Sequence, residues 1–352
     1  MDVADFDFEL PEELIAQRPL AERSESRLLV LPRAEGEARD QRFSDLLELL
    51  PPGALLVVNE TRVIPARFFG RRASGGKVEL LLLEPHPAGG WEALVKAGGT
   101  LQPPAEILEL EEGRARVRLL EKTGGGRYRV EFVDDDALSA AEECGRLPLP
   151  PYVQRELEAD PSADRERYQT VYARVPGAIA APTAGLHFTP ELLAALESRG
   201  VEVARVLLHV GLGTFLPVRA ERLEDHVMHS ERYAISPETC AQVERARAEG
   251  RPVIAVGTTS VRALEAWAAS GEPSGRTELF VTPGFEFQRV DGLITNFHLP
   301  RSTLLMLVSA FATRGRVLEA YAHAVREGYR FYSYGDAMYL GPLAGGGDPS
   351  RI

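Results

Sequence analysis

The sequence predicts a mixed α/β protein with about two domains. Its 352 residues suffice for two domains of roughly 100–200 residues each. Strands and helices alternate along residues 152–352, which is typical of an α/β domain. Residues 67–150 differ, because glycine-rich turns separate short runs there, several of which alternate apolar and polar residues. That pattern indicates a small antiparallel barrel or sandwich.

The first 66 residues are expected to contribute a helix over 45–50, which ends at Pro51-Pro52-Gly53, and a strand over 54–59. The strand (ALLVVN) is short, apolar and bounded by turn residues, so it is predicted to be buried. In the middle zone, strands are expected over residues 77–84, 91–96, 114–119 and 127–133. This zone ends in RLPLPP at 146–151, which is typical of a stiff polyproline linker.

The last zone has clear signals at its helix ends. Thr189 and Pro190 start a helix that Gly200 stops, and Ser236 caps a second helix that ends near Gly250. The expected order is a helix over 190–199, a strand over 201–210, the helix capped by Ser236, a strand over 252–256 and a helix over 260–269.

Composition excludes several classes of protein. Apolar residues make up 44% and charged residues 26%, close to globular averages, so a disordered or fibrous chain is not expected. The longest apolar run, 302–312, is shorter than the roughly 18–20 residues that span a bilayer. The N-terminus is acidic and lacks the basic start of a secretory signal, so a cytoplasmic protein is expected.

The net charge and the cysteines and histidines bear on two further kinds of site, for nucleic acid and for metal ions. The net charge of −12 disfavours electrostatic binding of nucleic acid over the whole surface, although a local basic patch can still bind RNA. Cys144 and Cys240 are far apart, and His226 and His229 have no third ligand nearby, so no metal site is expected.

Four turns rich in glycine or small polar residues follow or adjoin the strand-like runs, at 59–62 (NETR), 181–188 (APTAGLHF), 211–214 (GLGT) and 257–260 (GTTS). Strand ends of open α/β sheets are common ligand sites. The GTTS turn precedes a helix, so it is either an anion site for a carboxylate or phosphate, or a simple helix cap.

Three histidines lie in or beside such turns. His187 is in APTAGLHF, His209 precedes the GLGT turn, and His298 is in TNFHLP. Each is either a hydrogen-bonded structural residue or an acid–base group. The residues alone therefore indicate a two-domain α/β enzyme with a nucleotide-like ligand.

Motifs along almost the whole chain occur in the order of one known family. They are residues 6–20, 59–67, 75–84, 147–153, 166–173, 180–189, 208–218, 229–233, 253–265, 294–312 and 329–338. On these motifs the sequence closely resembles the S-adenosylmethionine:tRNA ribosyltransferase-isomerases of bacterial queuosine biosynthesis. The resemblance implies a large α/β domain of residues 1–66 and 151–352, with a smaller antiparallel β-barrel domain inserted at 67–150.

The resemblance also implies a reaction. The ribosyl group of S-adenosylmethionine is transferred to 7-aminomethyl-7-deazaguanine at the wobble position of tRNA and is isomerised, giving epoxyqueuosine-tRNA, adenine and methionine. S-adenosylmethionine is then a co-substrate, no further cofactor is expected, and a monomer without membrane contact is expected.

Candidate residues follow from this chemistry. Acid–base roles are expected for His187, His209 and His298, with Asp336 either orienting a histidine or binding the ribose. Substrate-binding candidates lie mostly in the turns, and they are Asn59, Thr61, Arg62, Pro182, Thr183, Gly185, Gly211, Gly213, Thr214, Phe215, Gly257, Thr258, Thr259, Ser260, Arg262, Asn296, Arg301 and Tyr334. Contacts to tRNA are expected from Arg67, Arg71, Arg72 and Lys77, which could equally be a solvated charged face.

Two other hypotheses remain open at this point. A related α/β enzyme could act on a small nucleotide and no longer on tRNA, or a non-catalytic protein could bind RNA through the barrel. The first would not need modified tRNA for activity. The second would bind tRNA without consuming S-adenosylmethionine.

Overall fold

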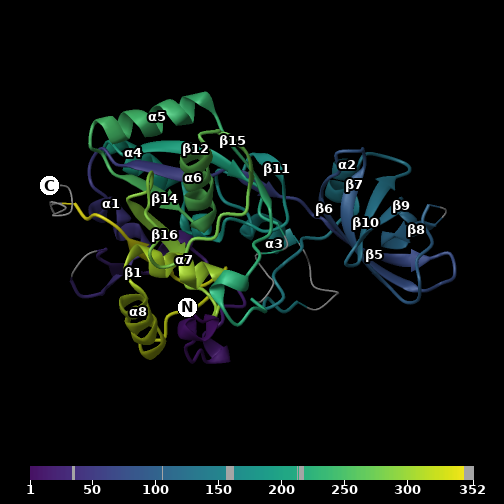
Figure 1. Ribbon diagram of the computed structural model, residues 1–352, viewed down its shortest axis with the longest axis horizontal. Coiled ribbons are helices and arrows are strands. Elements are labelled where there is room, and N and C mark those ends of the chain that lie inside the picture. The colour runs from purple at the N-terminus through teal and green to yellow at the C-terminus, as the bar shows by residue number, and fades with distance from the viewer. Residues whose placement is uncertain (34–35, 105, 156–161, 212, 214–217, 345–352) are drawn as a thin grey trace.

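The computed structural model describes residues 1–33, 36–104, 106–155, 162–211, 213 and 218–344. Figure 1 shows a larger unit of sheet and helices beside a smaller unit made mainly of strands. The larger unit contains the N-terminal segment and everything described after α3 (Ser162–Arg167), and the smaller one lies between them in the chain.

A sheet of nine strands forms the centre of the larger unit, in the order β15-β13-β12-β3-β14-β16-β17-β1-β2. Its strands are β1 (Arg27–Leu31), β2 (Arg39–Arg42), β3 (Leu55–Asn59), β12 (Glu202–Leu208), β13 (Glu231–Ile235), β14 (Val253–Val256), β15 (Ser274–Thr277), β16 (Gly292–Asn296) and β17 (Ala337–Leu340). The four neighbours β12, β3, β14 and β16 run parallel, so their carboxyl ends meet at one edge. A separate parallel pair joins β4 (Thr61–Val63) to β11 (Val175–Ala178).

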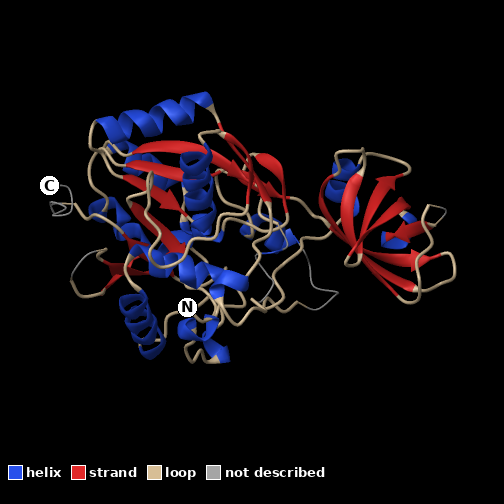
Figure 2. Cartoon of the chain, in the orientation of Figure 1, coloured by secondary structure: helices blue, strands red, loops and turns tan. Residues whose placement is uncertain are grey.

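Helices cover both faces of this sheet (Figure 2). They are α1 (Leu46–Leu49), α4 (Pro190–Ser198), α5 (Pro237–Ala248), α6 (Thr258–Ser270), α7 (Thr303–Phe311) and α8 (Arg314–Arg326). In β3, Leu55 and Val57 pack with α5 to α8, whereas Leu56 and Val58 pack with α1 and α4. The strand is buried on both faces, which explains its continuous apolar sequence.

Local signals predicted the helix ends well. Thr189 Oγ1 accepts from Leu192 N (3.1 Å), and Ser236 Oγ accepts from Thr239 N (3.1 Å), as the capping pattern predicts. The helix expected to begin at Ser260 begins two residues earlier, at Thr258. The expected helix over 45–50 is a 3₁₀ turn followed by the short α1.

Short 3₁₀ helices complete the described elements. They are η1 (Val3–Phe6), η2 (Glu12–Leu14), η3 (Arg23–Glu25), η4 (Phe43–Asp45), η5 (Glu111–Gly113), η6 (Thr183–His187) and η8 (Leu223–Asp225). No helix in the described part of the chain has both the length and the apolar character to cross a bilayer.

The smaller unit is a closed antiparallel barrel, which decides between the barrel and the sandwich. Its order is β10-β7-β6-β5-β8-β9, and its strands are β5 (Arg67–Arg72), β6 (Lys77–Pro85), β7 (Trp91–Ala97), β8 (Ile107–Leu110), β9 (Ala115–Gly124) and β10 (Arg127–Phe132). Helix α2 (Ala137–Cys144) packs its buried alanines against the barrel core. The four strands predicted in this zone are confirmed, and β5 and β8 are additional. The exact domain boundaries at 66/67 and 150/151 stay a prediction.

Candidate active site

One cavity lies where the parallel strands end. Because β14 and β16 run parallel, the turns that follow them meet at one edge of the sheet. The segment 180–184 reaches the same place from outside the sheet. We call this the sheet-edge cavity, and its polar lining includes Thr183, Thr258, Thr259, Arg262, Asn296 and His298, with Pro182 and Gly257 beside them.

The first turn of α6 faces this cavity. Gly257 has φ +83°, a backbone conformation that favours glycine, and no side chain caps the helix. Among the described residues, the N–H groups of Thr258 and Thr259 have no acceptor. Thr259 Oγ1 instead accepts from Asn59 Nδ2 (3.1 Å), and Ser260 Oγ donates back to Val256 O (2.8 Å). No side chain caps this helix, so its positive end suits an anion, and the choice between an anion site and a simple cap stays a prediction.

His298 lines the sheet-edge cavity. Its Nε2 lies 2.8 Å from Thr295 Oγ1, and its backbone N–H donates to the Tyr321 hydroxyl (3.0 Å). Burial lowers the pKa of His298 to about 3, so the ring is neutral at pH 7.

His187 has different surroundings. Both ring nitrogens are bonded inside the protein, Nδ1 to Ser26 Oγ (2.7 Å) and Nε2 to Asn296 Nδ2 (3.1 Å), and the ring stacks on Phe43. Burial, with the charges of Arg23 and Arg330, lowers its pKa to about 3. His187 does not line the sheet-edge cavity, so the structure gives it a supporting position behind Asn296, and its predicted acid–base role stays a prediction.

The low pKa of His187 predicts a loss of stability in acid. The unfolded chain takes up a proton near pH 6.5, whereas the folded chain does so only near pH 3. Between these values the free energy of unfolding should fall by about 1.4 kcal/mol for each pH unit that this histidine spans. In urea unfolding between pH 6 and 4, His187→Gln should show a shallower decline than the unaltered chain. Equal slopes would contradict a neutral buried His187.

Asp336 contacts Asn296, which is also the partner of His187. Its carboxylate accepts from the backbone N–H groups of Arg27 (2.9 Å) and Arg330 (2.8 Å) instead of contacting a histidine. Burial raises its pKa, and those hydrogen bonds oppose the shift. Only its backbone carbonyl reaches the site, by accepting from Asn296 Nδ2 (3.4 Å).

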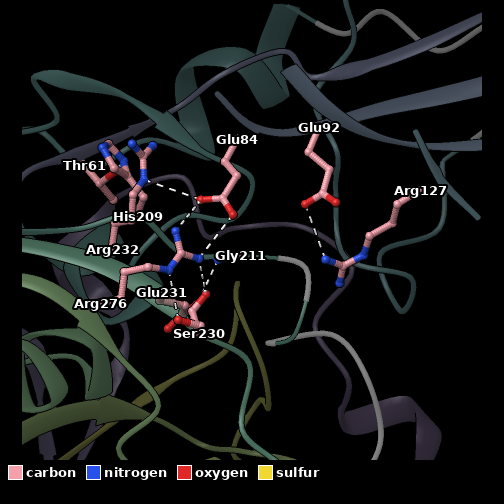
Figure 3. Close-up of polar contacts among 10 residues, drawn as sticks. All are labelled: Thr61, Glu84, Glu92, Arg127, His209, Gly211, Ser230, Glu231, Arg232 and Arg276. Carbon is pink, nitrogen blue, oxygen red and sulfur yellow. Dashed lines mark hydrogen bonds and ion pairs between the residues drawn. The ribbon is translucent and has the colours of Figure 1, made fainter. Parts of the chain in front are cut away.

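A second cavity lies where the barrel meets the large sheet (Figure 3). We call this the junction cavity. His209, at the end of β12, lines it and bonds to Thr61 Oγ1 through Nδ1 (2.9 Å). Burial and the charge of Arg232 lower the pKa of His209 to about 4, against the opposing effect of Glu84. Val210 lines both cavities, so the two are adjacent.

Charged side chains connect the two units at the junction cavity. Glu84 of β6 accepts two hydrogen bonds from Arg276 of β15 (3.0 and 3.1 Å) and pairs with Arg232 of β13 (3.5 Å), as Figure 3 shows. Within the barrel, Arg127 pairs with Glu92 (3.5 Å) on the cavity's other side. Sequence reasoning missed these residues, because isolated charges on distant strands carry no local motif.

Arg262, predicted to bind a carboxylate or phosphate, is held inside the protein. It forms a buried ion pair with Glu231 and donates from Nε to Leu279 O (3.2 Å). The other oxygen of Glu231 accepts from Gly211 N (2.8 Å). The pair therefore ties α6 to the loop after β12, although Arg262 still lines the sheet-edge cavity.

The fold and both cavities can now be compared with known proteins. A family model described as "Queuosine biosynthesis protein" matches residues 3–340. The chain belongs to this family. A relative in Anaeromyxobacter dehalogenans (strain 2CP-C), named S-adenosylmethionine:tRNA ribosyltransferase-isomerase, is 53% identical over 97% of this chain and 99% of its own length.

Two further members of the family agree. A relative of the same name in Heliobacterium modesticaldum (strain ATCC 51547 / Ice1) is 52% identical over 97% of this chain and all of its own length. The crystal structure of S-adenosylmethionine tRNA ribosyltransferase from Thermotoga maritima is 38% identical, covers 96% of this chain and 99% of its own, and has a TM-score of 0.56. The family resemblance stated from the motifs is thereby confirmed.

The other substrate-binding candidates in this family member differ in the contacts that they make within the protein. Asn59 is bonded on both sides of its amide, to the backbone of Leu208 and Thr61 and to Thr259. Gly185 and Gly213 allow close approach of Tyr172 and His229, and a Cβ on either glycine would collide with those side chains. Ion pairs or hydrogen bonds hold the remaining polar candidates, namely Arg62 with Glu142, Arg301 with Asp7, and Tyr334 with Asp164. Thr214 and Phe215 lie outside the described residues.

The four residues of β5 and β6 that were predicted to contact tRNA differ in how far other residues of the protein already bind them. Arg72 donates to Glu106 and to the carbonyls of Gly98 and Thr100, so its guanidinium is occupied inside the barrel. Arg67 pairs with Glu79 (3.5 Å). Arg71 and Lys77 are exposed and paired across the strands, and they are the better placed of the four for a phosphate. Among the described residues, no cluster of three His, Cys, Asp or Glu could hold a metal ion.

Proposed function

We propose that this chain is an S-adenosylmethionine:tRNA ribosyltransferase-isomerase of queuosine biosynthesis. It transfers and isomerises the ribosyl group of S-adenosylmethionine onto 7-aminomethyl-7-deazaguanine at the tRNA wobble position, with release of adenine and methionine. The identity of 53% over 97% of the chain to a relative of that name carries the proposal. It is expected to act as a cytoplasmic monomer without a further cofactor.

Two neutral histidines support this chemistry. The sulfonium of S-adenosylmethionine acidifies the C5′–H bond, so a base is needed there, and we assign it to His298 beside the free end of α6. The attacking amine must lose a proton as well, and His209 in the junction cavity is available for it. Because Val210 borders both cavities, the two substrates can meet between them.

The junction is also a suitable entry for RNA. A base of the anticodon loop can leave the stack and insert as a single group, so a local contact suffices for a protein of net charge −12. Arg71 and Lys77 are exposed at the end of β5 and β6 away from the junction cavity, where they are available to more distant phosphates of the tRNA.

The test of this proposal is adenine release. Purified protein is mixed with S-adenosylmethionine and tRNA that carries 7-aminomethyl-7-deazaguanine, and unmodified tRNA serves as the control. We expect adenine and methionine only with the modified tRNA. Release without tRNA would favour an enzyme acting on a small nucleotide. Binding of tRNA by folded protein without any release would favour a non-catalytic RNA-binding protein.

A further inference from the structure

The large sheet places two arginines side by side at the junction cavity. Arg232 of β13 and Arg276 of β15 are directly opposite each other in the antiparallel register, so their side chains share one face of the sheet. Both line the cavity and are partly exposed. Like charges in such a cross-strand pair repel each other. This part of the sheet therefore favours a carboxylate close to both guanidinium groups.

The barrel has the complementary arrangement. Glu84 of β6 is directly opposite Glu92 of β7, and both line the junction cavity. Glu92 is neutralised inside the barrel, where it pairs with Arg127 (3.5 Å) and accepts from Thr123 Oγ1 (3.1 Å). Among the described residues, the ion-pair partners of Glu84 all belong to the larger unit. Its repulsion from Glu92 is therefore offset when the barrel sits against β13 and β15.

The contact between Glu84 and the sheet has a defined geometry (Figure 3). Arg276 donates to both oxygens of Glu84, from Nη1 (3.0 Å) and Nη2 (3.1 Å). Ser230 holds the same guanidinium, because its Oγ accepts from Nε (3.0 Å) and its carbonyl from Nη2 (3.1 Å). Arg232 adds an ion pair with Glu84 (3.5 Å). A guanidinium that is already fixed loses little freedom on binding a carboxylate, so this contact sets both the distance and the orientation of β6.

Other contacts between the two units lie beside the chains that connect them. Arg165 of α3 donates to Gly145 O (2.7 Å), just after α2. Ile179 is buried in the hydrophobic core of the barrel together with Ile64, which precedes β5. Glu84 instead holds the barrel by β6, at the junction cavity itself.

We propose that Glu84, Arg232 and Arg276 form a latch that holds the barrel against the cavity of His209, which makes Glu84 a positioning residue. We call these three residues the junction latch. The barrel supplies one wall of this cavity and the large sheet, with His209, supplies the other. The closed latch keeps the two walls together and shields the imidazole, and the open latch exposes it. The catalytic meaning of this placement rests on the proposed function, whereas the shielding of His209 does not.

Chemical modification of the histidines tests the latch on the full chain. Diethyl pyrocarbonate modifies accessible neutral imidazoles, and mass spectrometry gives a rate for each histidine. Glu84→Gln should speed modification of His209 by about three- to tenfold, as expected for the loss of partly exposed ion pairs. His187 and His298 are buried within the larger unit and should not change. No change at His209, or an equal increase at all three histidines, would overturn the latch.

Glu92→Gln is the matched control. It removes a carboxylate of the same cavity whose ion-pair and hydrogen-bond partners lie in the barrel, so His209 should react as it does in the unaltered chain. An equal effect of Glu84→Gln and Glu92→Gln would show a general loosening of the cavity and would overturn the role assigned to Glu84.

Salt and a double variant test whether charge is the cause. Raising the salt from about 0.05 M to about 1 M should speed modification of His209 in the unaltered chain but not in Glu84→Gln. Glu84→Gln combined with Arg276→Gln should be no faster than Glu84→Gln alone, since the two side chains act through one contact. Additive effects, or equal salt dependence of both proteins, would overturn the latch. If the latch behaves as expected but adenine release fails, only the proposed function is lost.

Discussion

Replacing His298 with alanine is expected to lower the turnover number for adenine release by about 10²-fold or more. The ring lines the sheet-edge cavity, and burial keeps it neutral with a pKa of about 3. Its position makes it the candidate acceptor of the C5′ proton, since no other described histidine lines the cavity. Single-turnover adenine release at saturating substrates measures the effect directly.

The control is a histidine of the same chain in another setting. His323 lies in α8, bonds to Asp40 (3.1 Å) and does not line the cavity, so His323→Ala should turn over normally. Circular dichroism and thermal unfolding would show that both variants are folded. A folded His298→Ala protein with normal turnover would remove His298 from the acid–base residues and leave His209 as the main candidate.

The helices were predictable because their ends depend on neighbours in sequence. Thr189 and Ser236 cap α4 and α5 through residues three positions ahead. In contrast, β5 depends on a distant partner. A Cβ on Gly70 would lie 2.0 Å from Glu109 O of the adjacent β8, so this glycine reflects close packing in the closed barrel. Such closure leaves no local pattern.

The turns that form the site could be predicted from the sequence. The segments at 257–259 and 295–298 meet because the ends of parallel strands share an edge, and the segment at 181–183 reaches them from outside the sheet. The roles of individual residues were not predictable, since His187 and His298 occupy similar turns in the sequence. Their difference comes from long-range partners such as Ser26, which is 161 residues from His187. Likewise, nothing near Arg262 in the sequence announces its partner Glu231.

The second prediction with a large expected effect concerns the stability of the fold. Replacing Glu231 with alanine should lower the free energy of unfolding by about 3–5 kcal/mol, because it leaves the guanidinium of Arg262 buried without its counter-charge. The two side chains are only 8% and 4% exposed, so solvent cannot replace the lost partner. The change also removes the acceptor of Gly211 N. Urea unfolding at pH 7 measures the loss.

A double variant separates the buried charge from the contact it makes. Arg262→Met with Glu231→Leu removes both charges and fills similar space, so it should cost clearly less than Glu231→Ala alone. Glu231→Gln should fall between them, since an amide oxygen can still accept from Gly211 N. If the double variant proved as unstable as Glu231→Ala, the loss of side-chain packing rather than an unpaired charge would dominate.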